Sequence, residues 1–154
     1  MPSPASVSPS SNRSEYDRQS NRGYVFKDCT SLKRIEIPEG VTAIPDYAFR
    51  GCANLEEVVL PESLTTIGEW AFLGCTGLKS VALKSGLRTV KSRAFDGCTG
   101  LETVTAEEGL QSIGSYAFVN CSALKGVELP GTLTAISEYG FSGCTSLKTL
   151  TINK

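Results

Sequence analysis

The sequence predicts an α/β repeat solenoid, a right-handed stack of similar coils with one parallel β-sheet and short helical or 3₁₀ turns. Three observations support this prediction. The six cysteines recur every 23 residues without insertion or deletion, and the segment FLGCTGL returns as FDGCTGL and FSGCTSL. Apolar residues also keep fixed positions within each period, which is typical of stacked units that share one core. The cysteines are Cys29, Cys52, Cys75, Cys98, Cys121 and Cys144.

A β-strand is predicted in each period. A leucine is followed three and five residues later by apolar residues, as in Leu124, Val127 and Leu129. The last two positions enclose a variable one, which gives the period of two of a half-buried strand. A second apolar pair follows, as in Leu133 and Ile136, and predicts a second short strand or an extended edge.

A turn with a buried phenylalanine follows the second apolar pair. The segments DYAF, EWAF and SYAF place small and aromatic residues together and indicate a short helical or 3₁₀ turn. Two residues after each phenylalanine stands Gly, Asn or Asp, and these residue types tolerate positive φ. We therefore expect a left-handed residue to end each turn. These positions are Asp28, Gly51, Gly74, Gly97, Asn120 and Gly143.

The chain divides into two regions. Residues 1–22 are rich in Ser, Pro, Asn and Arg and predict a disordered tail, whereas residues 24–154 predict a solenoid of about five and a half 23-residue coils. One coil buries about eight apolar side chains, which gains on the order of 12–24 kcal/mol. Ordering the residues of one coil costs roughly 35 kcal/mol. A single coil therefore cannot fold alone, and the coils must stack.

Composition and charge argue against several classes of function for this chain. The net charge of −1 gives no electrostatic reason to expect nucleic acid as a partner. No apolar run reaches the length of a membrane span, so no membrane insertion is expected, and the first 22 residues lack the apolar stretch of a secretory signal. The chain has no histidine, the usual base for a serine or cysteine nucleophile. We expect no enzyme activity and no cofactor.

The cysteine column has three interpretations. Metal binding is disfavoured because the chain lacks C-x-x-C pairs and histidine. Disulfides are disfavoured because neighbouring coils place Cβ atoms about 4.8 Å apart with parallel vectors, whereas a disulfide needs about 3.8 Å and convergent ones. A buried ladder of free thiols that act as small hydrophobes is favoured. Free thiols indicate an intracellular compartment.

The repeat resembles a known family. LKGVEL and LEEVVL match the L-x-x-L-x-L strand pattern of leucine-rich repeats, and LPGTLTAISEYGFSGCTSL is similar to the BspA-like subclass. The likeness covers residues 24–154 and recurs in every coil. It departs from the general pattern after the strand, where glycine, serine or threonine replaces asparagine. The resemblance implies surface adhesion and partner binding in bacteria or protists, and hence a place at the cell surface.

The exposed face of the predicted sheet is the candidate binding surface for a protein partner. Its outward residues are mostly small and differ between coils, as a recognition surface and neutral variation both permit. The alternative is a structural spacer, one segment of a longer array without a ligand of its own. The predicted binding residues are Arg34, Glu36, Glu57, Val59, Ser80, Ala82, Thr103, Thr105, Glu128, Thr149 and Thr151.

Two further columns carry charged or aromatic side chains. The first alternates in charge through five coils, which indicates pairing along the stack. In the second, a row of rings suits a protein or sugar partner, but packing over the next coil is the favoured interpretation. The charged column is Lys33, Glu56, Lys79, Glu102, Lys125 and Lys148, and the aromatic column is Tyr24, Tyr47, Trp70, Arg93, Tyr116 and Tyr139.

The predicted stack lacks polar capping coils. The chain enters the repeat midway at Tyr24 and stops at TINK, directly after the strand that carries Leu147, Leu150 and Ile152. Solenoids need end coils with a polar outer face. This end therefore invites either a second copy or the remainder of a longer protein, and we expect self-association through the uncapped C-terminal coil.

Overall fold

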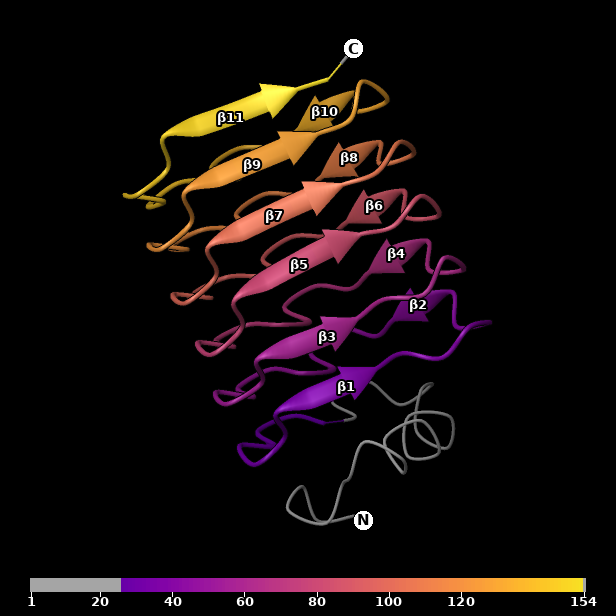
Figure 1. Ribbon diagram of the computed structural model, residues 1–154, viewed down its shortest axis with the longest axis vertical. Helices are drawn as coiled ribbons and strands as arrows, with labels where there is room; N and C mark the ends of the chain where they lie inside the picture. The colour runs from indigo at the N-terminus through magenta and orange to yellow at the C-terminus, as the bar shows by residue number, and fades with distance from the viewer. Residues whose placement is uncertain (1–25, 154) are drawn as a thin grey trace.

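The computed structural model describes residues 26–153, which form a parallel β-solenoid of stacked coils (Figure 1). The predicted repeat-solenoid fold class is confirmed. The predicted disordered tail, residues 1–22, lies outside the described residues. Two sides of each coil carry β-strands, and the third side is a series of turns.

The front strands carry the face predicted to bind a partner. Each strand runs parallel to its neighbour at a spacing of one period, so Ile35 lies opposite Val58 and Val81 lies opposite Val104. These inward residues are buried, and the residues between them face outward. The front strands are β1 (Arg34–Glu36), β3 (Glu57–Val59), β5 (Ser80–Leu83), β7 (Thr103–Ala106), β9 (Gly126–Leu129) and β11 (Thr149–Ile152).

The front sheet is divided between β3 and β5. β1 pairs with β3, while β5, β7, β9 and β11 form a separate four-stranded sheet. The backbone hydrogen bond from Lys79 N to Glu56 O is 3.5 Å long, whereas the equivalent bond from Glu102 N to Lys79 O is 2.8 Å. The single front sheet that the sequence predicts is therefore interrupted at this step because its strand-to-strand bonding weakens there.

The second strand of each coil forms a continuous parallel sheet on another side of the stack, in the order β10-β8-β6-β4-β2 (Figure 1). This sheet confirms the second short strand expected from the sequence. In β4 and β6 the residues Ile67 and Val90 are buried, and each follows a half-buried threonine. The strands are β2 (Ala43–Ile44), β4 (Thr66–Ile67), β6 (Thr89–Val90), β8 (Ser112–Ile113) and β10 (Ala135–Ile136).

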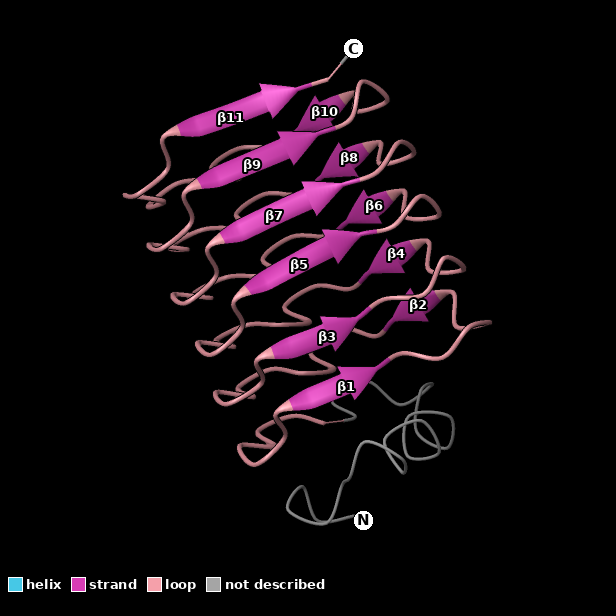
Figure 2. Ribbon diagram, in the orientation of Figure 1, coloured by secondary structure: helices cyan, strands magenta, loops and turns pink. Residues whose placement is uncertain are grey.

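The third side of each coil is formed by turns. Across residues 26–153 the structure contains no helix (Figure 2), and so none that is long and apolar enough to cross a membrane. Along this side, successive backbone N–H groups donate alternately to a carbonyl of their own turn and to a carbonyl of the next coil. Arg50 N donates within the turn to Tyr47 O at 3.1 Å, whereas Phe49 N and Gly51 N each donate to a carbonyl of the next coil at 2.7 Å. The turn side is therefore a third hydrogen-bonded ladder rather than the helical or 3₁₀ turn that the sequence predicts.

Left-handed residues explain why no helix forms on the turn side. The predicted column has positive φ throughout, from 59° at Asp28 to 78° at Gly51 and Gly143, which confirms that expectation. A second column, not anticipated from the sequence, is also left-handed, because its bulky residues have φ between 55° and 63°. Two left-handed residues in each turn prevent consecutive helical geometry. The second column is Tyr47, Trp70, Arg93, Tyr116 and Tyr139.

The core is a stack of phenylalanine rings enclosed by the three sides. Neighbouring rings from Phe26 to Phe141 lie 5.0 to 5.4 Å apart between centroids and nearly parallel. Leucine, isoleucine and valine from both strand columns surround them. Each coil thus buries its apolar face against the next, as the energetic argument from the sequence requires.

Candidate functional site

The front face brings all the predicted binding residues together on one surface. They occupy the outward positions of the six front strands, two on each strand except β9, where Glu128 stands with Gly126. Arg34 and Val59 are half-buried, and the other predicted residues are exposed. Alternation along each strand produces this surface, because the residues between the outward positions point into the core.

The front face has a charged part and an uncharged part. On β1 and β3, Arg34 Nε donates to Glu57 Oε1 at 2.9 Å and forms an ion pair between neighbouring strands. On β5 and β7 the outward side chains are small and uncharged. Glu128 on β9 then adds a carboxylate toward the C-terminal end. The front face therefore has a central patch of short side chains between two regions that carry charge. This central patch consists of Ser80, Ala82, Thr103 and Thr105.

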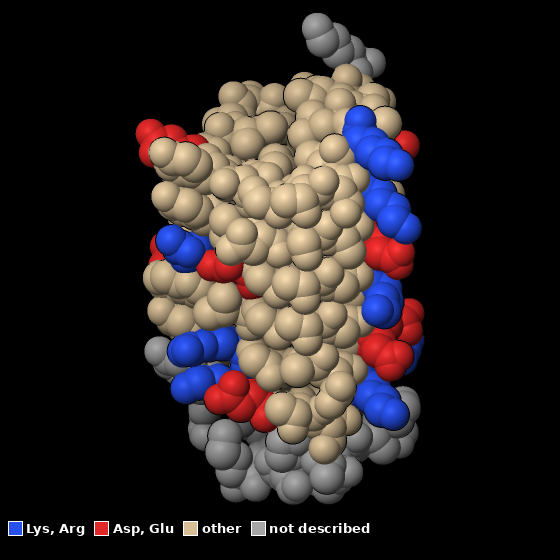
Figure 3. Space-filling model, turned by 90° about the vertical axis from the view of Figure 1, so that its left-hand side faces the viewer, with Lys and Arg blue, Asp and Glu red and all other residues tan. Residues whose placement is uncertain are grey.

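The column that alternates in charge borders the front face. Lysines and glutamates follow one another along one edge of the molecule (Figure 3). Within this column Lys125 Nζ lies 3.4 Å from Glu102 Oε1. Both groups are substantially exposed, so such a pair contributes roughly 0–1 kcal/mol to stability. The contact supports the interpretation that this column pairs along the stack.

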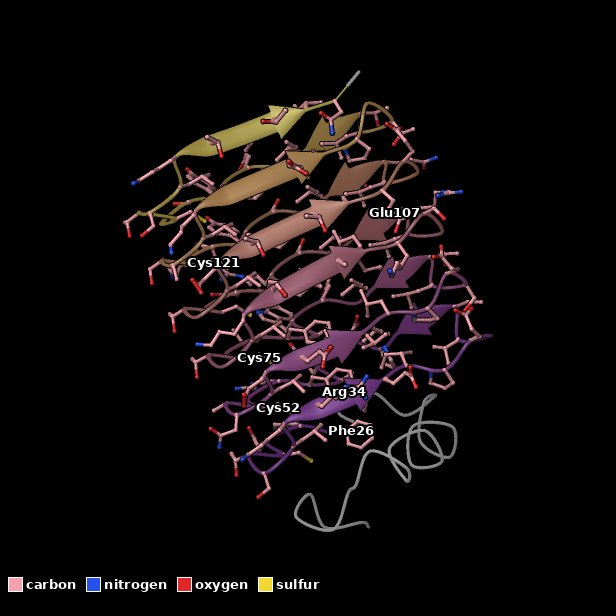
Figure 4. All side chains as sticks on the ribbon, in the orientation of Figure 1. Phe26, Arg34, Cys52, Cys75, Glu107 and Cys121 are labelled. Atoms are coloured by element: carbon pink, nitrogen blue, oxygen red, sulfur yellow. The ribbon has the colours of Figure 1, made fainter. Side chains whose placement is uncertain are left out.

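The buried ladder of free thiols predicted from the sequence is confirmed, but its hydrogen bonds were not anticipated. Cys52, Cys75 and Cys121 lie in a row near one end of the front strands, opposite the end where Glu107 lies (Figure 4). Each Sγ from Cys52 to Cys144 donates to the carbonyl oxygen of the phenylalanine 26 residues earlier, at 3.0 to 3.2 Å. The fixed F-x-x-C spacing, repeated every period, is the pattern from which this contact is recognisable. All six cysteines are free, and five are buried.

Burial makes the five buried thiols poor nucleophiles, whereas a hydrogen bond with Cys121 lowers the pKa of half-buried Cys144. Desolvation raises the pKa of Cys29 to about 11 and the pKa of Cys52 and Cys98 to about 12. A thiolate, not a thiol, is the nucleophile and the metal ligand. Among residues 26–153 no group of three or more His, Cys, Asp or Glu side chains is arranged to hold a metal ion. The buried thiols therefore contribute packing and hydrogen bonds to the fold.

The aromatic column packs against itself. Tyr47 stacks on Trp70 and Tyr116 on Tyr139, with ring centroids 5.0 Å apart in both pairs. Between these pairs Arg93 places its guanidinium 4.3 Å from the centroid of the Tyr116 ring and binds Asp96 at 2.8 Å. These contacts occupy ring faces of Tyr47, Trp70 and Tyr116, while Tyr139 stays 57% exposed. The contacts support the packing interpretation of this column.

A shallow depression of about 210 Å³ lies on the side of the second sheet, near β6 and β8. Hydroxyl groups and backbone dominate its lining, and its ionisable lining side chains are Glu69 and Lys91. It lies away from the predicted binding residues. No catalytic arrangement of side chains converges on it.

Comparison with known proteins identifies the repeat. The sequence pattern described as the BspA type leucine rich repeat region matches residues 19–148 in six copies. Among curated proteins, none matches the sequence. The match covers most of the chain and includes the stacked coils of the structure.

Solved structures show the same architecture. A leucine-rich repeat protein from T. pallidum is 30% identical, with a TM-score of 0.81 over 85% of this chain and 64% of that protein. A leucine-rich repeat protein from Bacteroides ovatus is 38% identical, with a TM-score of 0.73 over 82% of this chain and 32% of that one. The pneumococcal vaccine antigen PcpA, 24% identical with a TM-score of 0.67, shares the fold over 83% of this chain and 33% of its own. This chain thus spans less than two thirds of each of these proteins. Its repeat, its stacked coils and its parallel sheets together make it a member of the BspA-type leucine-rich repeat family.

Proposed function

We propose that this chain is a protein-binding module that recognises a protein partner through its front face, in an adhesion-type role without catalysis. One observation carries the proposal: the outward positions of the front strands vary in size and charge, while the inward positions of the same strands stay apolar in every coil. A uniform scaffold that presents a variable surface is the arrangement through which solenoids bind extended partners.

The central patch is the part of the front face that a partner approaches most closely. Its side chains are short, so a large side chain of a partner reaches close to the backbone of β5 and β7. Binding energy concentrates where aromatic or other large side chains are buried at the centre of an interface. The Arg34–Glu57 pair and Glu128 then orient the partner from the two ends of the patch.

The alternative function, a structural spacer, rests on a different observation. The Arg34–Glu57 and Lys125–Glu102 pairs already join neighbouring coils, so these charges have partners within the stack. A spacer needs this internal pairing and no exposed recognition groups.

The test compares variants that alter the front face with one that alters the second sheet. Proteins captured by the wild-type chain are identified, purified and titrated against each variant by calorimetry. Thr105→Arg places a long cation in the central patch, and Gln111→Arg places the same group at an exposed position before β8. We expect Thr105→Arg to weaken binding at least about tenfold and Gln111→Arg to leave it unchanged.

A charge exchange separates recognition from stability. The double variant Arg34→Glu with Glu57→Arg retains an ion pair between β1 and β3 but reverses its direction. We expect it to keep the melting temperature and to lose affinity. If a purified partner binds wild type and every front-face variant equally, recognition through the front face is wrong and the spacer function is favoured.

A further inference from the structure

The junction between β3 and β5 lacks backbone hydrogen bonds that join other front strands. The N–H of Lys84 donates to no backbone carbonyl among residues 26–153, whereas Glu107 N, one period later, donates to Leu83 O at 2.9 Å. Leu60 N likewise has no backbone acceptor in this range, although Ile37 N, one period earlier, has one at 2.9 Å. Together with the long bond at the start of β5, these gaps leave the front ladder open along this junction.

The aromatic column is interrupted at the same junction. Trp70 stacks on Tyr47 in the coil before it, and the guanidinium of Arg93 lies over the ring of Tyr116 in the coil after it. Among residues 26–153 no ring or cation contact joins Trp70 to Arg93. The two ion pairs between neighbouring coils also lie on either side of this junction rather than across it. Two separate features of the surface therefore stop at one place in the stack.

The core and the other two sides continue across the junction. Phe72 and Phe95 stack with centroids 5.0 Å apart, and Cys98 Sγ donates to Phe72 O at 3.1 Å. On the second sheet β4 pairs with β6, and the turn side keeps its backbone bonds at 2.7 to 3.3 Å. One exposed hydrogen bond, from Ser85 Oγ to Glu62 Oε2 at 2.8 Å, also crosses near the front. The junction is therefore held on two sides and open on the third.

This distribution of contacts favours one motion over the others. Separating the coils or sliding them past one another would break the second sheet and expose the phenylalanine stack to water. Tilting them so that the front widens keeps both intact and breaks no ladder bond, because the front ladder is already open there. Hinge motions of this kind are absorbed at a few positions while the units on either side stay rigid.

We propose that the junction between β3 and β5 is a hinge, at which the coils that carry β1 and β3 tilt as one unit against the coils that carry β5 to β11. The hinge divides the front face, since Arg34 and Glu57 lie on one side of it and the central patch lies on the other. Its consequence for binding rests on the proposed function: a partner that contacts both parts of the front face selects one angle between them.

Spin labels at exposed positions measure the tilt by electron paramagnetic resonance. Labels attached through keto-bearing amino acids leave the six native thiols unmodified. The test pair, Glu36 with Ala82, crosses the hinge on the front face. The matched pair, Ala82 with Glu128, spans as many coils without crossing it, and a third pair, Thr65 with Gln111, crosses it on the second sheet. The Cα atoms of each pair lie about 10 Å apart, two strand spacings.

The widths of the three distance distributions decide the proposal. We expect the test pair to be at least about twofold wider than the matched pair, and the third pair to be as narrow as the matched pair. Equal widths for the test and matched pairs would mean a rigid stack and overturn the hinge. A third pair as wide as the test pair would mean that the coils separate instead of tilting, which also contradicts the proposal.

Amide exchange of the unlabelled chain provides a second measurement. The protection factor of the Lys84 amide should be at least about tenfold lower than that of Glu107, and that of Leu60 at least about tenfold lower than that of Ile37. Each comparison sets an open position of the junction against a bonded position of the same column. Equal protection within both comparisons would mean that the front ladder is closed in solution, and the hinge would be wrong.

A purified partner tests the consequence for binding. When a partner that discriminates among the front-face variants is added, the test pair should narrow at least about twofold and the matched pair should not change. A test pair that stays wide in this complex would show that the partner does not fix the hinge angle. If the partner fails to discriminate among those variants, the proposed function is wrong, while the label widths of the free chain still decide the hinge.

Discussion

The thiol of Cys75 donates to the carbonyl oxygen of Phe49 at 3.1 Å, which links one coil to the turn side of the coil before it. The carbonyl also accepts the N–H of Cys52, three residues later in its own coil. The oxygen therefore has two donors, and the small side chain that supplies the second one occupies a buried position without an unpaired polar group. This contact is repeated along the stack and explains why a cysteine occupies this position in each coil.

The thiol ladder predicts slow reaction with thiol reagents in the folded protein. Five cysteines are buried, and all six are free. Native protein should react slowly with a chromogenic disulfide reagent, with half-buried Cys144 reacting first. Unfolding in guanidinium without reductant should release six reactive thiols for each chain. A count below six in the denatured sample would demonstrate disulfides.

The raised thiol pKa values predict a loss of stability at alkaline pH. The pKa of Cys52 and of Cys98 rises from 9.0 to about 12 because burial disfavours the thiolate. Between these pH values the unfolded chain releases thiol protons that the folded chain retains, so the free energy of unfolding falls as pH rises from 9 toward 12. Urea unfolding at several pH values measures this slope. The comparison is with Cys98→Ala, whose slope should be shallower because it lacks one of these thiols.

Ala106 predicts a stabilising substitution. It is half-buried at the end of β7, in a column where Leu83 and Leu129 are buried. The ladder between β7 and β9 also ends at Thr105, one residue before Ala106. We expect Ala106→Leu to raise the free energy of unfolding by about 1 kcal/mol, measured by urea denaturation. Ala82→Leu, at an outward position of β5, is the control and should have little effect. A lower melting temperature for Ala106→Leu would mean that neighbouring side chains already fill the space.

Substitutions at Gly74 measure the energetic cost of placing a side chain on a left-handed residue. Its φ is 75°, and a Cβ added there meets no atom within 4 Å. Gly74→Ala should therefore destabilise the fold by roughly 1–2 kcal/mol through backbone strain alone. Gly74→Asn should cost less, because asparagine holds this conformation in the same column at Asn120, where φ is 62°. Equal losses for both variants in calorimetric melting would contradict this account.

The 23-residue period predicts the features of the fold that depend on spacing and residue class. The buried columns, the outward positions from Arg34 to Thr151 and the left-handed column at Gly51 all follow from repetition of apolar, variable and flexible residues. The second left-handed column does not, because Tyr47 and Trp70 belong to residue types that rarely adopt positive φ. Their conformation is imposed by hydrogen bonds to the next coil, such as Tyr47 N to Glu69 O at 2.9 Å, which depend on the three-dimensional stack.

The candidate site was predictable in position but not in its internal contacts. Alternation along the strands places Glu57 and Glu128 on one face, and the structure bears out that placement. The ion pair between Arg34 and Glu57 depends on side-chain rotamers and on the pairing of β1 with β3. The interruption between β3 and β5 has no counterpart in the sequence period, since the spacing from Val58 to Val81 equals that of every other step.

The left-handed aromatic column determines the order in which the coils of the stack unfold on heating. Each bulky residue such as Trp70 or Tyr116 carries its conformational cost within its own coil, roughly 1–2 kcal/mol. The ring contacts and backbone hydrogen bonds that offset this conformational cost form only between adjacent coils. A stack has one fewer junction than it has coils, so one left-handed residue in the stack lacks these contacts. In a nearest-neighbour description the terminal coil is therefore the weakest unit. Melting should begin as fraying at Tyr139 and move inward coil by coil, and cooperativity should increase with the number of coils.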